Sequence, residues 1–283
     1  MGVQVVIKTI FITFFLKYFF FSKILYNFAV HKQLYVSLVR MKKALSVYGT
    51  AYFVLLAFVL GLLYVYPKLE LHLLLNSWHT HIQDIFFTYY SMLAEGPLYV
   101  LALLPLLWKK KELTIFFALC ELSAGAVLQI LKHLISTDRP VSAFENLHNM
   151  VLPLVEGVNM HHSNSFPSGH ASTFFIFCTS CALILAYHYQ RRSKQNNLKK
   201  RVLINLSLFS LLILAALGAY SRVYLSQHFL SDVCVGSIIG FITPCLYFYF
   251  GGNKILKIKM NAVHVSDSEV GKQKGNNVQA NIQ

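Results

Sequence analysis

The sequence predicts an all-α integral membrane protein, built as a bundle of six core transmembrane helices, and two observations lead to this class. Hydrophobic residues make up 56% of the 283 residues and charged residues only 13%, whereas soluble domains carry about 25% charged residues. Apolar windows of about 20 residues, long enough to cross about 30 Å of hydrocarbon as a helix, recur along the chain. They cover residues 44–66, 86–107, 113–135, 170–189, 202–220 and 228–250.

The ends of the chain differ from this core. Residues 1–43 are apolar and Phe-rich but interrupted by lysines, and three interpretations are open: an interfacial helix with snorkelling lysines, an additional span, or an upstream extension ahead of a natural start at Met41. Residues 44–250 form the predicted membrane domain. Residues 251–283 turn polar and are predicted to be a disordered cytoplasmic tail, because they contain too few apolar residues to build a core.

The distribution of charge predicts the orientation of the bundle. The formal net charge is +14, but the cations gather in alternate loops, at residues 40–43, 109–111, 191–201 and 254–259, while the opposite loops hold few besides Lys68 and the motif residues. Cytoplasmic loops carry the excess of Lys and Arg in membrane proteins. The pattern therefore places both termini in the cytoplasm and the three polar motifs on the outer face, and it predicts no nucleic-acid partner.

The first polar motif, residues 132–140 (KHLISTDRP), ends the third predicted span. A lysine within the membrane boundary is costly, so Lys132 is expected to be paired or functional, the alternative being that it snorkels to the headgroups. Arg139 follows after six residues, and Pro140 stops the helical continuation.

The second motif, residues 167–170 (PSGH), precedes the fourth span. Free backbone N–H groups and the helix dipole make a helix start an anion site. Gly169 allows the backbone to approach a phosphate closely, Ser168 adds a hydroxyl donor, and His170 is a candidate acid for a departing oxygen. The alternative is an ordinary serine N-cap.

The third motif, residues 221–232 (SRVYLSQHFLSD), joins the last two spans. His228 and Asp232 are four residues apart, so on a helix they share one face. The carboxylate can accept one imidazole N–H and leave the other ring nitrogen as a nucleophile or base. Arg222 can hold phosphate oxygens through paired hydrogen bonds. A capping pair at the membrane interface is the alternative for His228 and Asp232.

Taken together, the patterns KX6RP, PSGH and SRX5HX3D in this order resemble the signature of the type 2 phosphatidic acid phosphatase superfamily, which also includes vanadium haloperoxidases and bacterial acid phosphatases. The resemblance covers roughly residues 44–250. It implies that His228 attacks phosphorus to form a phosphohistidine, that Asp232 orients His228, and that His170 protonates the leaving group. It also implies that phosphate oxygens are held without a metal or other cofactor, by Lys132, Arg139, Ser168, Gly169 and Arg222.

The predicted function is hydrolysis of a phosphomonoester or pyrophosphate on a lipid headgroup, at the periplasmic face of a bacterial inner membrane, with an undecaprenyl pyrophosphate or lipid A type of substrate. Three alternatives stay open at this stage. The phosphoryl group can pass to a second lipid instead of water, the site can bind vanadate as a haloperoxidase, or the protein can bind lipid without catalysis. Other polar residues are left out of the predicted site. They are His161 and His162 near PSGH, Glu121 within the third span, and the interfacial group of Trp78, His79, His81 and Asp84.

Overall fold

The computed structural model describes residues 32–145, 147, 151–192 and 198–255, and the predictions made for residues 1–31 and 256–283 lie outside these ranges. The described residues form helices and connecting loops, without strands. The helices are α2 (Lys32–Val65), α3 (Lys68–Leu75), α4 (His81–Met92), α5 (Gly96–Lys109), α6 (Lys111–Leu134), α7 (Pro140–Glu145), α8 (Gly169–Arg192), α9 (Leu198–Tyr224) and α10 (Leu230–Ile255).

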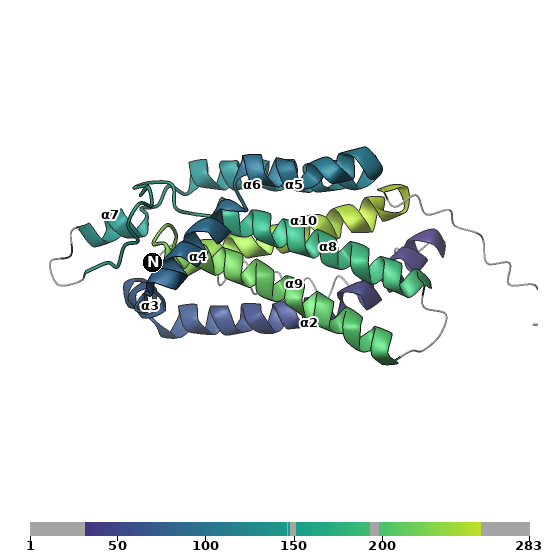
Figure 1. Cartoon of the computed structure of the whole chain (residues 1–283), viewed down its shortest axis with the longest axis horizontal. Helices are drawn as coiled ribbons and strands as arrows, with labels where there is room; N and C mark the ends of the chain where they lie inside the picture. Colours follow the sequence, from purple (N-terminus) through teal and green to yellow (C-terminus); the bar gives the residue numbers. More distant parts are fainter. Residues whose placement is uncertain (1–31, 146, 148–150, 193–197, 256–283) are drawn as a thin grey trace, which may run out of the picture.

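Five of the helices are long and apolar enough to cross a membrane, within the part of the chain that the structure describes. The candidate spans are Ser46–Val65, Lys111–Leu134, Gly169–Tyr189, Leu198–Tyr224 and Leu230–Gly251. They correspond to five of the six predicted windows and run side by side along the long axis of the molecule (Figure 1). The all-α membrane class is confirmed, and the chain is an integral membrane protein.

The predicted span over residues 86–107 is not one helix. It is divided between α4 and α5, which are 12 and 14 residues long, with a break between Met92 and Gly96. The cause is local: Pro97 occupies the first turn of α5, and proline fits there because it lacks the N–H that a helix interior needs. The count of six single-helix spans is therefore not confirmed, although both short helices pack in the bundle, α4 against α9 and α5 against α6.

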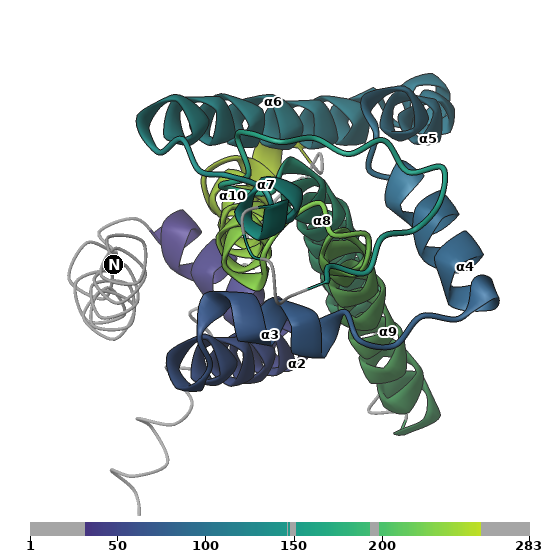
Figure 2. The same ribbon diagram turned by 90° about the vertical axis from the view of Figure 1, so that its left-hand side faces the viewer.

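Helix α8 is the centre of the bundle. It packs against α9, α10, α2 and α6, and its spanning window is 67% buried, against 22–50% for the other candidate spans. One apolar cluster joins it to α2, α9 and α10, and a second joins it to α5, α6 and α10. Viewed from the end of the bundle, α8 lies inside the ring that the other long helices form (Figure 2).

Helices α8 and α10 pack closely, and their contact depends on two glycines. A side-chain carbon at Gly236 would collide with the backbone carbonyl of Ser168, and one at Gly240 would collide with the carbonyl of Ser172. The two helices can approach this closely only because position 236 and position 240 carry no side chain. Since Ser168 belongs to the PSGH motif, this contact fixes the start of α8 against the start of α10.

Chain direction brings the three motifs to one end of the bundle. Helices α6 and α9 end there and helices α8 and α10 begin there, together with the short helices α3 and α7 (Figures 1 and 2). The described residues that connect these four helices at this end are 135–145, 147, 151–168 and 225–229. This end is called the site end below.

Candidate active site

The predicted nucleophile and its carboxylate partner form a buried pair at the site end. His228 and Asp232 are each 2% exposed, and His228 Nδ1 lies 3.7 Å from Asp232 Oδ2, which is beyond hydrogen-bonding range. Ser165 stands between them: its hydroxyl donates to Asp232 Oδ2 at 2.5 Å and contacts His228 Nδ1 at 3.4 Å. The arrangement leaves Nε2 of His228 outside the contact with the carboxylate.

His228 lies just before α10 and not on it, so the pairing does not come from a shared helix face as expected. Asp232 occupies the first turn of α10, and its Oδ2 accepts the backbone N–H of Phe229 at 3.0 Å. This is half of a capping box, in which a carboxylate at the third helical position closes the helix start. The carboxylate thus caps the helix and contacts the histidine at once, which joins the two interpretations that the sequence left open.

Burial lowers the pKa of His228, the charge of Asp232 opposes this, and Arg139 and Arg222 lower it further. The net direction is down from the ordinary value of about 6.5. The imidazole is therefore neutral at neutral pH. A neutral ring has a free lone pair, which nucleophilic attack requires.

Arg139, just ahead of α7, fastens the loops of the site to each other. Its Nε donates to the carbonyl of Ser163 at 3.0 Å, and its Nη1 donates to the carbonyl and to the side chain of Gln227, both at 3.1 Å. Gln227 is the residue before His228. Arg139 is only 8% exposed, and its guanidinium ties the loop before α8 to the turn that carries His228.

Arg222 and Lys132 supply two further cations from the ends of α9 and α6. Nη1 of Arg222 donates to the hydroxyl of Ser91 on α4. Its Nε is buried and has no hydrogen-bond partner among the described residues, which is costly unless an acceptor arrives. Lys132 is half-buried in the last turn of α6, and its charge interacts with those of Arg139, Arg222 and Asp232. An anion with several oxygens would satisfy the donors that these side chains leave unused.

The PSGH motif forms the start of α8. The buried hydroxyl of Ser168 accepts the N–H of Ala171 at 3.4 Å, as an N-cap does, and still has its own hydrogen to donate. The backbone N–H of Ser168 donates to the carbonyl of Asp232 at 3.0 Å. Nothing lies within 4 Å of the position where a side-chain carbon on Gly169 would be, so the space beside this backbone is open. His170, in the first turn, interacts electrostatically with Arg222 and His228.

All eight residues predicted for the site therefore gather at the site end. Sequence reasoning missed three of the residues that hold them, which are Ser165, Gln227 and Ser91, and it missed the contact of Lys68 with Phe229 beside them. Gln227 lies within the third motif and Ser165 lies two residues before the second, and this proximity was the available signal. Ser91 is a serine in an apolar run, without any such signal. Lys68 Nζ lies 3.8 Å from the centre of the Phe229 ring, and burial lowers its pKa while Asp232 and Asp138 oppose this.

The other polar residues noted in the sequence have separate positions. Glu121 accepts a hydrogen bond from Thr173 at 2.6 Å and so links α6 to α8. His162 contacts Glu145 and Ser142, both at 3.2 Å, on the exposed surface. His161 is exposed, and burial together with Arg139, Arg222 and Lys132 lowers its pKa. His79 and Asp84 are partly buried and contact each other, with 2.9 Å between Nδ1 and Oδ1.

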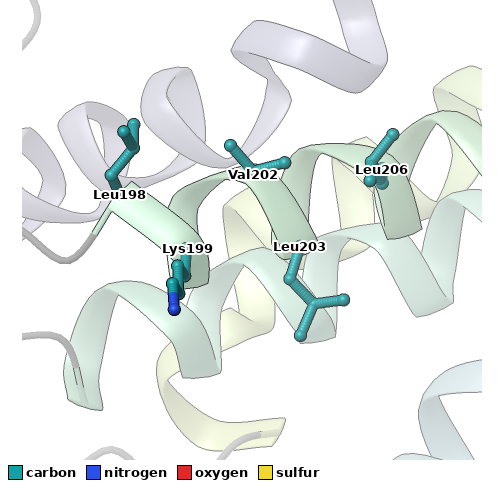
Figure 3. Close-up of a pocket in the computed structure, with 5 residues that line it drawn as sticks. All are labelled: Leu198, Lys199, Val202, Leu203 and Leu206. Carbon is teal, nitrogen blue, oxygen red and sulfur yellow. The ribbon is translucent and has the colours of Figure 1, made fainter.

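A pocket at the opposite end of the bundle has a different character. It lies along the first turns of α9 and is lined by Leu198, Val202, Leu203 and Leu206, with the ammonium group of Lys199 at its edge (Figure 3). Apolar side chains along one exposed helix face are what a spanning helix presents to lipid. The motif residues are remote from it, at the other end of α9.

The fold and the gathered motifs define a class, a helical membrane protein with cationic and histidine side chains clustered at one end. The chain belongs to the PAP2 superfamily, whose family model matches residues 113–256. Membership and the apolar spans together identify it as an integral membrane member of that superfamily. The chain is similar to the crystal structure of LpxE from Aquifex aeolicus, with 25% identity, a TM-score of 0.46, and coverage of 69% of this chain and 98% of that one.

It is also similar to the transmembrane PAP2 type phosphatidylglycerolphosphate phosphatase from Bacillus subtilis, with 18% identity and a TM-score of 0.47. This match covers 78% of this chain and 99% of that one. A search of curated proteins returned no match.

Proposed function

We propose that the protein hydrolyses a phosphate ester or pyrophosphate of a lipid headgroup through a phosphohistidine on His228. The observation that carries the proposal is the meeting of a buried, neutral imidazole with three cationic side chains and a helix start at one point of the fold. Phosphoryl transfer needs little covalent chemistry from a protein beyond positioning and charge stabilisation. These residues supply both.

In the proposed first step, Nε2 of His228 attacks phosphorus, the P–O bond to the lipid breaks, and His170 gives its proton to the departing oxygen. Lys132, Arg139 and Arg222 stabilise the equatorial oxygens, where negative charge is concentrated. The hydroxyl of Ser168 and the amide of Gly169 donate to the same oxygens. Asp232 stabilises the positive charge that develops on the imidazole.

In the second step, water loses a proton to His170 and attacks the phosphohistidine, which releases inorganic phosphate and restores both histidines. The negative charge of bound phosphate favours the protonated form of His170 in the first step, since three cations otherwise surround that ring. The fixed cations take the place that a divalent metal has in other phosphoryl transferases, so the proposal includes no metal.

The proposed substrate is an undecaprenyl pyrophosphate or a lipid A type of phosphate, at the periplasmic face of a bacterial inner membrane. Two features support an outer-face site: cations predominate in the loops at the other end of the spans, and the three motifs share the site end. Loops set specificity in many enzymes, and residues 141–166 form the long connection beside the motifs.

The test is phosphate release by the full-length protein in detergent with EDTA, on undecaprenyl pyrophosphate, lipid A, phosphatidylglycerol phosphate and phosphatidic acid. His228→Ala is expected to lose activity by at least about 10³-fold, as removal of a nucleophile does. His133→Ala, an exposed histidine near the end of α6, is the matched control and should stay within about twofold.

Phosphate label that stays on the protein distinguishes the proposed intermediate from other phosphoproteins by its stability to acid, because a phosphohistidine is acid-labile. Label on wild-type protein that is acid-labile and absent from His228→Ala supports the proposal. Full activity in His228→Ala, or activity lost on chelation, contradicts it. Label that moves into a second lipid instead of inorganic phosphate would assign a phosphotransferase.

A further inference from the structure

The turn that carries His228 contains a backbone conformation that serine rarely adopts. Ser226, two residues before His228, has φ of +51° and is completely buried. Non-glycine residues avoid this left-handed region because their side-chain carbon crowds the backbone. A conformation of this kind persists when the surrounding structure holds it. The question is therefore which residues hold Ser226.

Two residues of the α3 region contact the Ser226 hydroxyl. Asn76 Nδ2 donates to Ser226 Oγ at 2.5 Å, and Ser226 Oγ donates onward to the carbonyl of Pro153 at 3.1 Å. His72 Nε2 adds a contact with Ser226 Oγ at 3.4 Å. Asn76 and Ser226 are both fully buried, so these bonds are not exchanged with water. They hold the serine side chain in one direction.

A second set of contacts holds Asn76 itself. Its Oδ1 lies 2.8 Å from Nε2 of His79, and Nδ1 of His79 lies 2.9 Å from Oδ1 of Asp84. The hydroxyl of Tyr224, the last residue of α9, donates to the same Asp84 oxygen at 2.5 Å. The His79 ring also packs on the Tyr224 ring, with 4.3 Å between centroids. We call Asn76, His79 and Asp84 the α3–α4 bracket.

The bracket contacts both sides of the bend in the chain. It reaches Tyr224 through Asp84 and Ser226 through Asn76, so it spans the three-residue segment by which α9 ends. Immediately after it, the backbone N–H groups of Gln227 and His228 both donate to the carbonyl of Arg222 at 3.0 Å. The position of His228 therefore depends on a turn whose two sides are held from α3 and α4. All three bracket residues lie outside the part of the chain matched by the family model, residues 113–256.

The donors and acceptors of the bracket are mutually consistent. The carbonyl of Pro153 only accepts, and Asn76 Nδ2 lies 3.3 Å from it, so the amide nitrogen faces Pro153 and the amide oxygen faces His79. His79 must then donate at Nε2. Its Nδ1 faces a carboxylate, which also accepts. Each polar atom along the path from Asp84 to Ser226 has a partner of the opposite kind when both ring nitrogens of His79 carry hydrogen, because Asn76 Oδ1 and Asp84 Oδ1 can only accept.

We propose that Asn76 and His79 are positioning residues for the nucleophile, acting through the Asn76–Ser226 hydrogen bond on the turn that presents His228. The inference rests on the proposed role of His228. Misplacing a reacting group by about 1 Å can cost about 100-fold in rate. Loss of the bracket should therefore lower kcat, while phosphate binding by Arg139, Ser168 and Gly169 continues.

The test compares Asn76→Leu, His79→Ala and His79→Gln with His81→Ala, an exposed histidine on α4, as the matched control. Asn76→Leu is expected to lower kcat by about 10- to 100-fold with KM changed by no more than about twofold. His79→Ala should lower kcat by about 3- to 10-fold, and His79→Gln, which keeps an N–H toward Asn76, should recover most of it. Inhibition by inorganic phosphate should stay as in the wild type.

Ser226→Gly provides the measurement that a general loss of folding would not pass. Glycine adopts positive φ without the bracket, so Asn76→Leu should cost much less kcat in the Ser226→Gly background than in the wild type, which a double-mutant cycle measures. An equal cost in both backgrounds, an unchanged kcat in Asn76→Leu, or a rise in KM alone would each overturn the proposal. Failure of the proposed function would give a different result, which is either a wild-type protein without phosphate release or an active His228→Ala variant.

Discussion

The two parts of the site end differ in what they contribute and in how visible they are in the sequence. The part from α6 to α10 carries the groups that are proposed to face the phosphate, in three motifs of fixed order. The part from α3 and α4 carries none of the motif residues, yet Ser91 holds Arg222 and the bracket holds the turn before His228. Reacting groups can be recognised by residue type and spacing, whereas their supports are recognised only by contact.

The largest loss of activity is expected from a change at Asp232, the carboxylate among the motif residues. Asp232→Asn removes the charge that faces His228 but keeps one acceptor oxygen for the Ser165 hydroxyl, and it is expected to lower kcat by about 10²- to 10⁴-fold. Glu70→Gln, an exposed carboxylate-to-amide change on α3, is the control. Steady-state kinetics on the best lipid of the panel would check it, and a loss below tenfold would remove Asp232 from its proposed role.

The next largest effect is expected where α8 meets α10. Gly236→Ala places a carbon against the carbonyl of Ser168, and such overpacking costs about 1–3 kcal/mol. Gly125→Ala on α6 meets nothing within 4 Å and should gain up to about 1 kcal/mol, because alanine favours helix over glycine. Thermal unfolding in detergent should therefore shift in opposite directions for the two variants. Shifts of the same sign would contradict the close helix contact.

The part formed by α3 and α4 leads to a prediction about how stability depends on pH. Burial lowers the pKa of His72 to about 4, with Asp232 opposing and Lys68 assisting. The unfolded chain, with an ordinary pKa of about 6.5, then binds the proton first, so stability is full above pH 6.5 and declines as pH falls toward 4, by on the order of 2–3 kcal/mol. His72→Gln should flatten this part of the profile of thermal unfolding against pH. An unchanged slope would show that His72 does not contribute to it.

The smallest effect on activity is expected at Ser91, the α4 residue that contacts Arg222. Ser91→Ala removes one hydrogen-bond partner of Arg222 and leaves its charge in place, so kcat/KM should fall by about 3- to 10-fold. Ser123→Ala is a suitable control, since the Ser123 hydroxyl bonds only to carbonyls of its own helix at Leu119 and Cys120. If both variants behave alike, the α4 contact does not position Arg222.

The sequence predicted the membrane class, five of the spans and the meeting of the three motifs, because apolar length and helix direction decide these properties. It did not predict the break before Gly96, although the Glu95-Gly96-Pro97 run was its signal. It predicted a shared helix face for His228 and Asp232, whereas His228 precedes α10 and Ser165 joins the pair. Side-chain contacts across long separations, such as Asn76 with Ser226, leave no local pattern, so they could not be predicted.

The central position of α8 has a consequence for the membrane around the protein. A spanning helix adapts to a thicker or thinner bilayer by tilting, and the lipid-facing helices beside it tilt as well. Because α8 packs against four helices and is the most buried of the candidate spans, a change in bilayer thickness acts first on the outer helices. The placement of His170 relative to His228 depends on the contact of α8 with α10. The chemical step should accordingly be less sensitive to the acyl-chain length of the surrounding lipid than the capture of the substrate.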